Sequence, residues 1–230
     1  MKKLVVLTGA GISAESGIPT FRDANGLWEG HDVMEVASPA GWESNQDLVL
    51  KFYNERRKAV LKAEPNPGHK ALVDLEDHFD VTIVTQNVDN LHEKAGSSNI
   101  IHLHGEIMKA RSSVDESLIY DLDQPLINKG DLCEKGSQLR PHIVWFGELV
   151  PMMQPATAAA AEADIFVIAG TSLQVYPAAG LFQYCTYDTP VYLVDPKIPD
   201  GVRATRVKCF EEPASTGLPK LKDILINEFS

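Results

Sequence analysis

A glycine-rich turn directly follows the first apolar segment of this chain and constrains its fold more than any other feature. The apolar run at residues 4–7 has the length and composition of a buried strand, and residues 9–14 fit the pattern GxGxxA. In a strand–turn–helix unit, glycines let the backbone approach a pyrophosphate, which free N–H groups and the helix N-terminus bind. The turn therefore predicts a dinucleotide site, and the alternative is a turn needed only for chain reversal.

The segment after this turn differs from that of a simple dehydrogenase. In such enzymes an acidic residue about twenty positions after the motif holds the adenine ribose at the end of the next strand. Here Pro19 cuts the first helix short, Phe21, Arg22 and Asp23 follow, and the next strong strand signal comes only at residues 81–84. A large insertion thus lies within the first crossover.

Length and composition limit the class of protein. With 230 residues, 44% of them hydrophobic, the chain can form one sizeable core with a small satellite lobe. It has no apolar run of about eighteen residues, which predicts no membrane span, and its first apolar run is too short for a signal peptide. We therefore expect a cytoplasmic protein.

The net charge limits the classes of binding partner, and the cysteines limit the kinds of crosslink and metal site. A formal net charge of -11 argues against direct nucleic-acid binding, which needs a basic surface, but is compatible with basic, lysine-bearing proteins. The three cysteines, Cys133, Cys185 and Cys209, are far apart and odd in number. A disulfide framework and a four-thiolate zinc site are therefore not expected.

Apolar runs alternate with helical patterns along the chain. We predict strands at 3–8, 81–85, 143–145, 165–169 and 191–194, with helices at 47–62, from Asn66 to Phe79, at 152–163 and at the C-terminus. This order predicts an α/β fold: a Rossmann-like parallel sheet with helices on both faces, plus a small inserted lobe. We expect a single catalytic domain over 1–230, with its core at about 1–23, 65–106 and 141–230 and its lobe at about 24–64 and 107–140.

Polar residues follow two of the predicted strands. Gln86, Asn87 and Asp89 come directly after one strand, and Thr171 and Ser172 follow another. Because ligands of open α/β sheets bind at the carboxyl ends of strands, these side chains are candidates for the cleft. Helix capping is the alternative, although it explains Asn87 or Asp89 and not all three of the first group.

Two histidines lie close together in the segment HLHG. A metal pair formed by His102 and His104 lacks a third ligand of suitable spacing, whereas a single imidazole can act as a general base near neutral pH. A histidine with only a structural hydrogen bond at a strand end is the alternative.

Two further groups suggest contacts with a substrate. Residues 144–148 (VWFGE) could pair with a bound peptide as an extended edge or be simply a packed strand end. Tyr53 and Arg56 are three residues apart on a predicted helix and could grip a carboxylate, or be ordinary helix-surface residues. Arg57 should point elsewhere and serve as a control.

Taken in order, the motifs GAGIS…ESGIPTFRD, TQNVDNLH, HLHG, VWFGE and GTSLQVYP resemble the sirtuins, NAD-dependent protein-lysine deacylases, over nearly the whole chain. The Tyr53–Arg56 pair resembles the class III branch, in which such residues favour succinyl and malonyl groups. The resemblance implies that the acyl oxygen displaces nicotinamide from NAD. It also implies catalysis by Asn87 and by His104, the general base that takes the proton of a ribose hydroxyl as this hydroxyl attacks the imidate carbon. Water then completes the release of free lysine and O-acyl-ADP-ribose.

The resemblance also implies the remaining site residues. The NAD-binding residues are Gly9, Ala10, Gly11, Ser13, Glu15, Thr20, Phe21, Arg22, Trp28, Gln86, Asn87, Val88, Asp89, Gly170, Thr171, Ser172, Asp195 and Ala214. The substrate-binding residues are Tyr53, Arg56, Val144, Trp145, Phe146, Gly147 and Glu148.

The sequence departs from the family pattern at two places. Many sirtuins carry two cysteine pairs between the catalytic histidine and the Trp-Phe-Gly motif, but this interval holds only Cys133, with Ser112 and Ser113 near the first pair and Lys135 near the second. We predict no zinc, with Leu118, Ile119, Leu122, Leu126 and Ile127 forming a small apolar core instead. Asp195 stands where asparagine is common and can still accept from ribose hydroxyls.

The sequence therefore predicts an NAD-dependent lysine deacylase, acting on acyl-lysine proteins or peptides, that favours succinyl and malonyl groups and also removes acetyl. We expect a monomer. An ADP-ribosyltransferase and a catalytically silent NAD or acyl-peptide sensor are the alternative functions.

Overall fold

The computed structural model describes residues 1–20, 27–122, 124–199, 202 and 207–230. Its strands are β1 (Lys3–Thr8), β2 (Leu27–Trp28), β3 (His31–Asp32), β4 (Asp80–Thr85), β5 (Ile100–His102), β6 (Gly105–Ser112), β7 (Ile119–Asp121), β8 (Leu139–Ile143), β9 (Ile165–Ala169), β10 (Val191–Val194) and β11 (Lys208–Phe210). Its helices are α1 (Gly11–Ala14), α2 (Val33–Val36), α3 (Pro39–Ser44), α4 (Gln46–Lys62), α5 (Pro67–Asp74), α6 (Leu91–Ala95), α7 (Met153–Ala161) and α9 (Ala214–Phe229), with 3₁₀ turns η1 (Leu75–Asp77) and η2 (Ala178–Tyr184).

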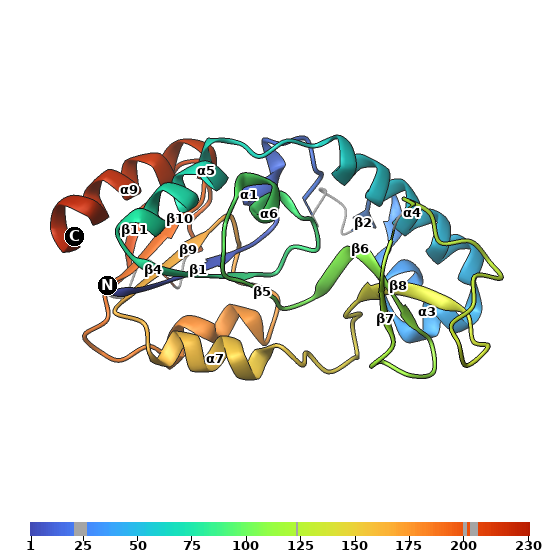
Figure 1. Ribbon diagram of the computed structural model, residues 1–230. Coiled ribbons are helices and arrows are strands. Elements are labelled where there is room, and N and C mark those ends of the chain that lie inside the picture. The colour runs from blue at the N-terminus through green and yellow to red at the C-terminus, as the bar shows by residue number, and fades with distance from the viewer. Residues whose placement is uncertain (21–26, 123, 200–201, 203–206) are drawn as a thin grey trace.

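The larger lobe is built on a parallel sheet of six strands in the order β11-β10-β9-β1-β4-β5. Successive side chains of a strand point to opposite faces, and β1 is buried on both. Leu4 and Val6 pack in a cluster with residues of α5 and α9, whereas Val5 and Leu7 pack with residues of α7 and η2. Figure 1 shows α5 and α9 above this sheet and α7 below it. The predicted α/β fold with helices on both faces is confirmed.

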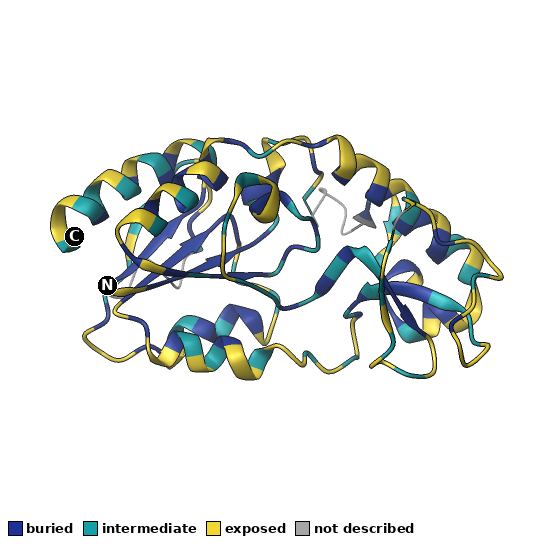
Figure 2. Ribbon diagram, in the orientation of Figure 1, coloured by how far each residue is buried: buried dark blue, intermediate teal, exposed yellow. Residues whose placement is uncertain are grey.

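The smaller lobe contains the antiparallel sheet β7-β6-β8, the hairpin β2-β3 and helices α2 to α4. Its core is rich in aromatic residues, among them Trp28, Trp42, Phe52, Tyr53 and Trp145. Figure 2 shows buried residues running through the six-stranded sheet and again through this lobe. The predicted helix at 47–62 corresponds to α4, which begins one residue earlier.

One predicted core strand is wrong. The segment 143–145 was expected in the parallel sheet, but β8 ends at Ile143 and pairs antiparallel with β6 in the smaller sheet. Trp145 instead packs in the core of the smaller lobe, 5.8 Å from the Trp42 ring between ring centroids. A three-residue apolar run carries no information about which of two cores buries it.

The apolar core proposed in place of zinc is also wrong in part. Ile127 is buried, but Ile119 and Leu126 are 46% and 37% exposed. Side chains of α4 and the aromatic residues fill the lobe, so this loop covers the core rather than forming one. Among the described residues, no helix is long and apolar enough to cross a bilayer.

Candidate functional site

The loops that follow β1 and β9 meet at the centre of the sheet. The strand β1 pairs with β4 on one side and β9 on the other, which makes the carboxyl ends of β1 and β9 the topological switch point where α/β sheets bind ligands. Gly9 N donates to Ala169 O at 3.1 Å, and Gly11 N donates to Gly170 O at 2.8 Å. The two loops are therefore bonded to each other by their backbones.

Glycine is required here because the two loops touch. A Cβ on Gly9 would lie 2.7 Å from Thr171 Cβ, and one on Gly11 would lie 2.8 Å from Gly170 Cα. Gly170 has a φ of +63°, and its Cβ would lie 2.2 Å from Ile12 N. The amides of Gly9 and Gly11 are also used between the loops, so a phosphate would meet other groups, such as Ala10 N–H and the Ser172 hydroxyl.

A cavity of about 610 Å³ opens at this switch point and extends between the two lobes. The sequence-predicted residues that line it are Gly9, Ala10, Gly11, Ser13, Glu15, Thr20, Trp28, Tyr53, Arg56, Gln86, Asn87, Val88, Asp89, His104, Val144, Trp145, Phe146, Gly147, Glu148, Gly170, Thr171, Ser172 and Asp195. Ala214 does not line it; this residue is buried at the start of α9 against Gly68, and its neighbour Pro213 lines the cavity instead. Phe21 and Arg22 lie outside the described residues.

His104 is held as a neutral base. Its Nδ1 lies 3.0 Å from Gln86 O, and because a carbonyl can only accept, Nδ1 carries the proton and Nε2 is left with its lone pair. Burial lowers the pKa of His104, and the hydrogen bond to the carbonyl opposes this shift only in part. The ring is therefore unprotonated near neutral pH.

Asn87 and Asp89 join the end of β4 to the first glycine turn. Asn87 Nδ2 donates to Gly9 O at 3.2 Å and to Ser13 Oγ at 3.1 Å, and Ser13 Oγ donates to Asp89 Oδ2 at 3.0 Å. Asp89 Oδ1 also accepts from Leu91 N at 3.1 Å, but the N-cap of α6 is Asn90, whose side chain makes no capping bond, so neither Asn87 nor Asp89 is the N-cap. Burial raises the pKa of Asp89, and its hydrogen bonds oppose the shift.

Gln86 and Asp195 occupy the ends of β4 and β10. Gln86 Nε2 donates to Thr171 Oγ1 at 3.2 Å, which links the ends of β4 and β9. One oxygen of Asp195 accepts from Lys197 N at 2.8 Å, and burial raises the pKa of this carboxyl. Its second oxygen can still accept from a ligand hydroxyl.

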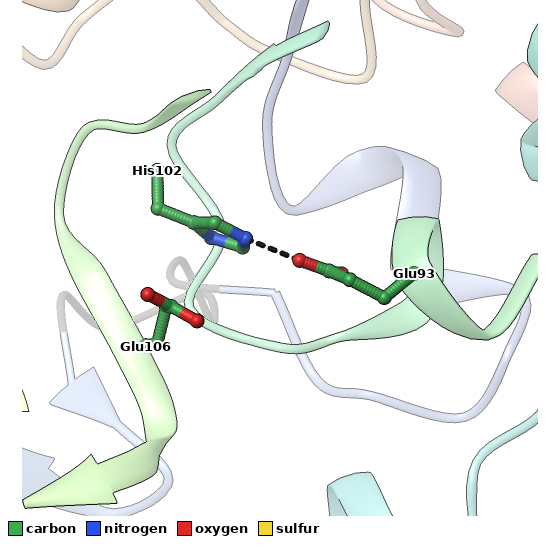
Figure 3. A group of neighbouring side chains, drawn as sticks. All are labelled: Glu93, His102 and Glu106. Atoms are coloured by element: carbon green, nitrogen blue, oxygen red, sulfur yellow. Dashed lines mark hydrogen bonds and ion pairs between the residues drawn. The ribbon is translucent and has the colours of Figure 1, made fainter. Parts of the chain in front are cut away.

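The two histidines of HLHG have different partners. His102 Nε2 lies 2.6 Å from Glu93 Oε1, whereas His104 lines the cavity. Figure 3 shows His102 with Glu93 and Glu106. One ring nitrogen of His102 and one carboxylate oxygen of each glutamate lie within 4.8 Å of one another, close enough to hold a metal ion. Burial lowers the pKa of His102, but the bond to Glu93 and the nearby carboxylates outweigh it and raise the pKa overall. Lys109 Nζ lies 2.9 Å from Glu106 Oε1, so a lysine ammonium also adjoins this group.

Tyr53 and Arg56, both on α4, line the part of the cavity that lies in the smaller lobe. Tyr53 is fully buried, and its hydroxyl accepts from Trp145 Nε1 at 3.0 Å, which leaves its own proton to donate. Burial raises the pKa of Tyr53 above its ordinary value, so the hydroxyl stays protonated. The Arg56 guanidinium stacks 4.5 Å from the centroid of the Trp28 ring and pairs with Glu29. Trp28, expected among the NAD-binding residues, thus lies beside Arg56.

Arg57 points away from this pair, as predicted, but it is not a neutral control. It is fully buried, and its Nε donates to Ile107 O at 2.6 Å while Nη1 donates to Asn54 Oδ1 at 2.8 Å. Arg57 therefore binds α4 to β6, and its replacement would disturb the smaller lobe.

Residues 144–148 follow β8 and end in a turn, in which Glu148 N donates to Trp145 O at 3.0 Å, and the amides of residues 144–146 are already bonded. Val144 N donates to His104 O and Phe146 N to Ala37 O, both at 2.9 Å, and Trp145 N donates to Glu148 Oε2 at 2.8 Å. A peptide lying along this segment would therefore be held by carbonyl groups and by Gly147. Arg140 and Arg111 bind the Glu148 carboxylate at 2.6 and 3.0 Å and fix the turn. Their hydrogen bonds and charges outweigh the effect of burial and lower the pKa of Glu148.

The residues at the expected zinc position do not fit a zinc site. Cys133 Sγ lies 3.3 Å from Ser112 Oγ and 3.2 Å from Ser137 Oγ, and the two hydroxyls lie 3.0 Å apart. Structural zinc requires four thiolate or imidazole ligands, and one thiol with two hydroxyls does not supply them.

The apolar wall of the cavity and Glu29 were not predicted from the sequence. The wall includes Ile18, Ala37, Val60, Ile143, Val150, Val175, Tyr176, Pro177 and Pro213. These residues come from both lobes and share no spacing pattern, so only the three-dimensional structure brings them together.

Together, the sheet, the bonded glycine loops and the cavity between two lobes define an α/β protein with a dinucleotide-type site. Residues 9–177 match the Sir2 family. An NAD-dependent protein deacylase of Helicobacter pylori is 54% identical over 226 residues, covering 98% of each chain, and one of Bacteroides thetaiotaomicron is 52% identical over 231 residues, covering 98% of this chain and 99% of its own.

Solved structures agree with these relatives. A Sir2 homologue in complex with NAD superimposes with a TM-score of 0.87 at 36% identity, covering 100% of this chain and 91% of that chain. A Sir2 variant with a deacetylated p53 peptide and 3′-O-acetyl ADP-ribose gives a TM-score of 0.81 at 27% identity, covering 98% and 93%. This chain belongs to the Sir2 family.

Proposed function

We propose that this protein is an NAD-dependent protein deacylase that frees lysine side chains and forms nicotinamide and O-acyl-ADP-ribose. The observation that supports this most strongly is that a single cavity holds the two glycine loops, the neutral His104 and the Tyr53–Arg56 pair. The relatives named as deacylases, and the homologue solved with NAD, support the same conclusion.

The residues of the cavity fit NAD. The backbone of the glycine loops and the hydroxyls of Thr171 and Ser172 suit the phosphates, and Asp195 at the end of β10 suits a ribose. When bound, NAD supplies an electrophilic ribose carbon from which nicotinamide can leave. Asn87 and Asp89, almost fully buried at the end of β4, would exclude water from the nicotinamide end.

His104 would act as the general base. Its Nδ1–H is fixed by Gln86 O, so Nε2 is oriented and can remove a proton from a ribose hydroxyl. Positioned general bases of this kind contribute about 10²- to 10⁴-fold in rate.

We further propose that the enzyme prefers succinyl- and malonyl-lysine and removes acetyl groups less efficiently. Arg56 is 6% exposed, lines the cavity and offers a buried positive charge, and the Tyr53 hydroxyl beside it can donate to a carboxylate. Charge-assisted binding of an acyl carboxylate at such a site would contribute about 2 kcal/mol, or tens-fold in kcat/KM.

An Arg56→Met variant tests this preference. We expect desuccinylation to fall tens-fold while deacetylation stays within a few-fold, because only the acidic acyl group uses the guanidinium. Nicotinamide release with succinyl- and acetyl-lysine peptides is the measurement, and Lys58→Met, which removes a cation on the exposed face of the same helix, is the control. Equal loss of both activities in Arg56→Met would contradict the assigned role.

The remaining proposals concern partners and location. The substrates would be acyl-lysine proteins or peptides that lie along residues 144–147, without direct nucleic-acid binding. We also propose that the protein acts as a monomer in the cytoplasm. Its three cysteines, few and far apart in the sequence, suit a reducing compartment.

A further inference from the structure

Glu29 stands at the tip of the β2-β3 hairpin in an unusual backbone conformation. The two-residue loop between Trp28 and His31 has positive φ at both positions, 50° at Glu29 and 83° at Gly30. Such loops favour Asn or Gly at the first position, and a glutamate with positive φ is disfavoured. Local turn preference therefore does not explain why this position is a glutamate.

The hairpin directs Glu29 onto Arg56. The carboxylate pairs with Arg56 Nη1, and the two side chains are 28% and 7% exposed. Burial lowers the pKa of Arg56, and the charge of Glu29 is the strongest influence that opposes this shift. Within the described part of the chain, Arg56 Nε has no hydrogen-bond partner. The contact of Nη1 with Glu29 is therefore a main polar interaction of the Arg56 guanidinium.

Glu29 itself does not line the cavity, whereas Trp28 and Arg56 do. The carboxylate therefore offsets the guanidinium charge without filling the space that an acyl chain would use. An acidic acyl group entering from the cavity meets a cation that is already paired, and a neutral acyl group meets a site without an uncompensated charge.

We propose that Glu29 is a specificity-determining residue that competes with the acyl carboxylate for Arg56, thereby limiting the preference for acidic acyl groups and keeping neutral acyl groups as substrates. This inference rests on the proposed function of Arg56 in acyl selection.

The test is the ratio of kcat/KM for succinyl-lysine to that for acetyl-lysine peptides in Glu29→Gln. The amide keeps the shape of the side chain and removes the charge, so we expect the ratio to rise about three- to tenfold, mostly through a lower KM for succinyl-lysine. Because both activities are measured on one preparation, a change in the folded fraction cancels in the ratio. Glu55→Gln, which removes an exposed carboxylate next to Arg56 in the sequence, should leave the ratio unchanged.

A double-mutant cycle assigns the effect to the pair. In an Arg56→Met background, Glu29→Gln should no longer change the ratio. An unchanged or lower ratio in Glu29→Gln, or the same increase in both backgrounds, would overturn the competition. If the wild type does not favour succinyl-lysine and Arg56→Met changes nothing, the proposed acyl preference has failed and this inference fails with it.

Discussion

The protonation state of His104 determines the pH range in which we expect activity. Burial holds the pKa of His104 below its ordinary value of 6.5. The unprotonated ring is the active form, so a lowered pKa keeps activity at pH values where a solvated histidine is already protonated. Activity should therefore be constant around neutral pH and fall as the pH drops through the lowered pKa.

We expect the acid limb of kcat/KM to have its midpoint below pH 6.5, and His104→Ala to lose about 10²-fold or more in rate. The measurement is nicotinamide release across a pH series. His78→Ala, which removes an exposed histidine bonded to Ser230 Oγ, is the matched control. A midpoint above 6.5, or nearly full activity in His104→Ala, would show that another group is the base.

Among the individual site residues, those that directly follow strands could be predicted from the sequence. Gln86, Asn87, Asp89 and Thr171 come directly after apolar runs, and the topology of a parallel sheet brings such positions together. Glu29 could not be predicted as the partner of Arg56, because the two are 27 residues apart and the hairpin between them has no periodicity. What each residue binds stays a prediction.

Among the elements, the contact between the loops after β1 and β9 is the one on which the site depends. Gly170→Ala would place a Cβ 2.2 Å from Ile12 N at a φ of +63°. We expect a loss of more than about 2 kcal/mol in the free energy of unfolding, together with loss of NAD binding. Urea unfolding and NAD titration are the measurements.

Gly180→Ala is the control for this prediction. The added Cβ would lie 3.7 Å from the nearest atom, in the Tyr176 ring, so the change should be within about 0.5 kcal/mol. Similar stability of the two variants would mean that the loops can separate without cost.

The loop around Cys133 in the smaller lobe leads to a prediction about the zinc content of the protein. Its thiol and the hydroxyls of Ser112 and Ser137 bond to one another, and they do not form a zinc ligand set. We expect purified protein to contain far less than one zinc per chain and to keep its activity and fold in a chelator. One tightly bound zinc per chain, lost together with the fold, would refute this.

The elements themselves were predictable in proportion to their length and burial. The strands β1, β9 and β10 match the predicted bounds, because continuous apolar runs are typical of strands covered on both faces. The short edge strands β5 and β11 were missed, since three partly exposed residues carry little pattern. The position of β8 in the smaller sheet depends on pairing with β6, which no local signal encodes.

For the whole molecule, the central feature is that both lobes contribute to one cavity. The larger lobe provides the glycine loops, Asn87 and His104, and the smaller lobe provides Tyr53, Arg56 and the turn fixed by Glu148. An NAD-binding fold alone could support ADP-ribose transfer to protein or silent binding. We expect transfer of the acyl group to ADP-ribose instead, because one cavity brings the unprotonated His104 and the Tyr53–Arg56 pair together with the glycine loops.

The products formed from NAD and a succinyl-lysine peptide test this account most directly. Mass spectrometry with labelled NAD should find one nicotinamide and one O-succinyl-ADP-ribose for each lysine freed. Label attached to protein, or NAD bound without nicotinamide release, would contradict the account and support one of the two alternative functions.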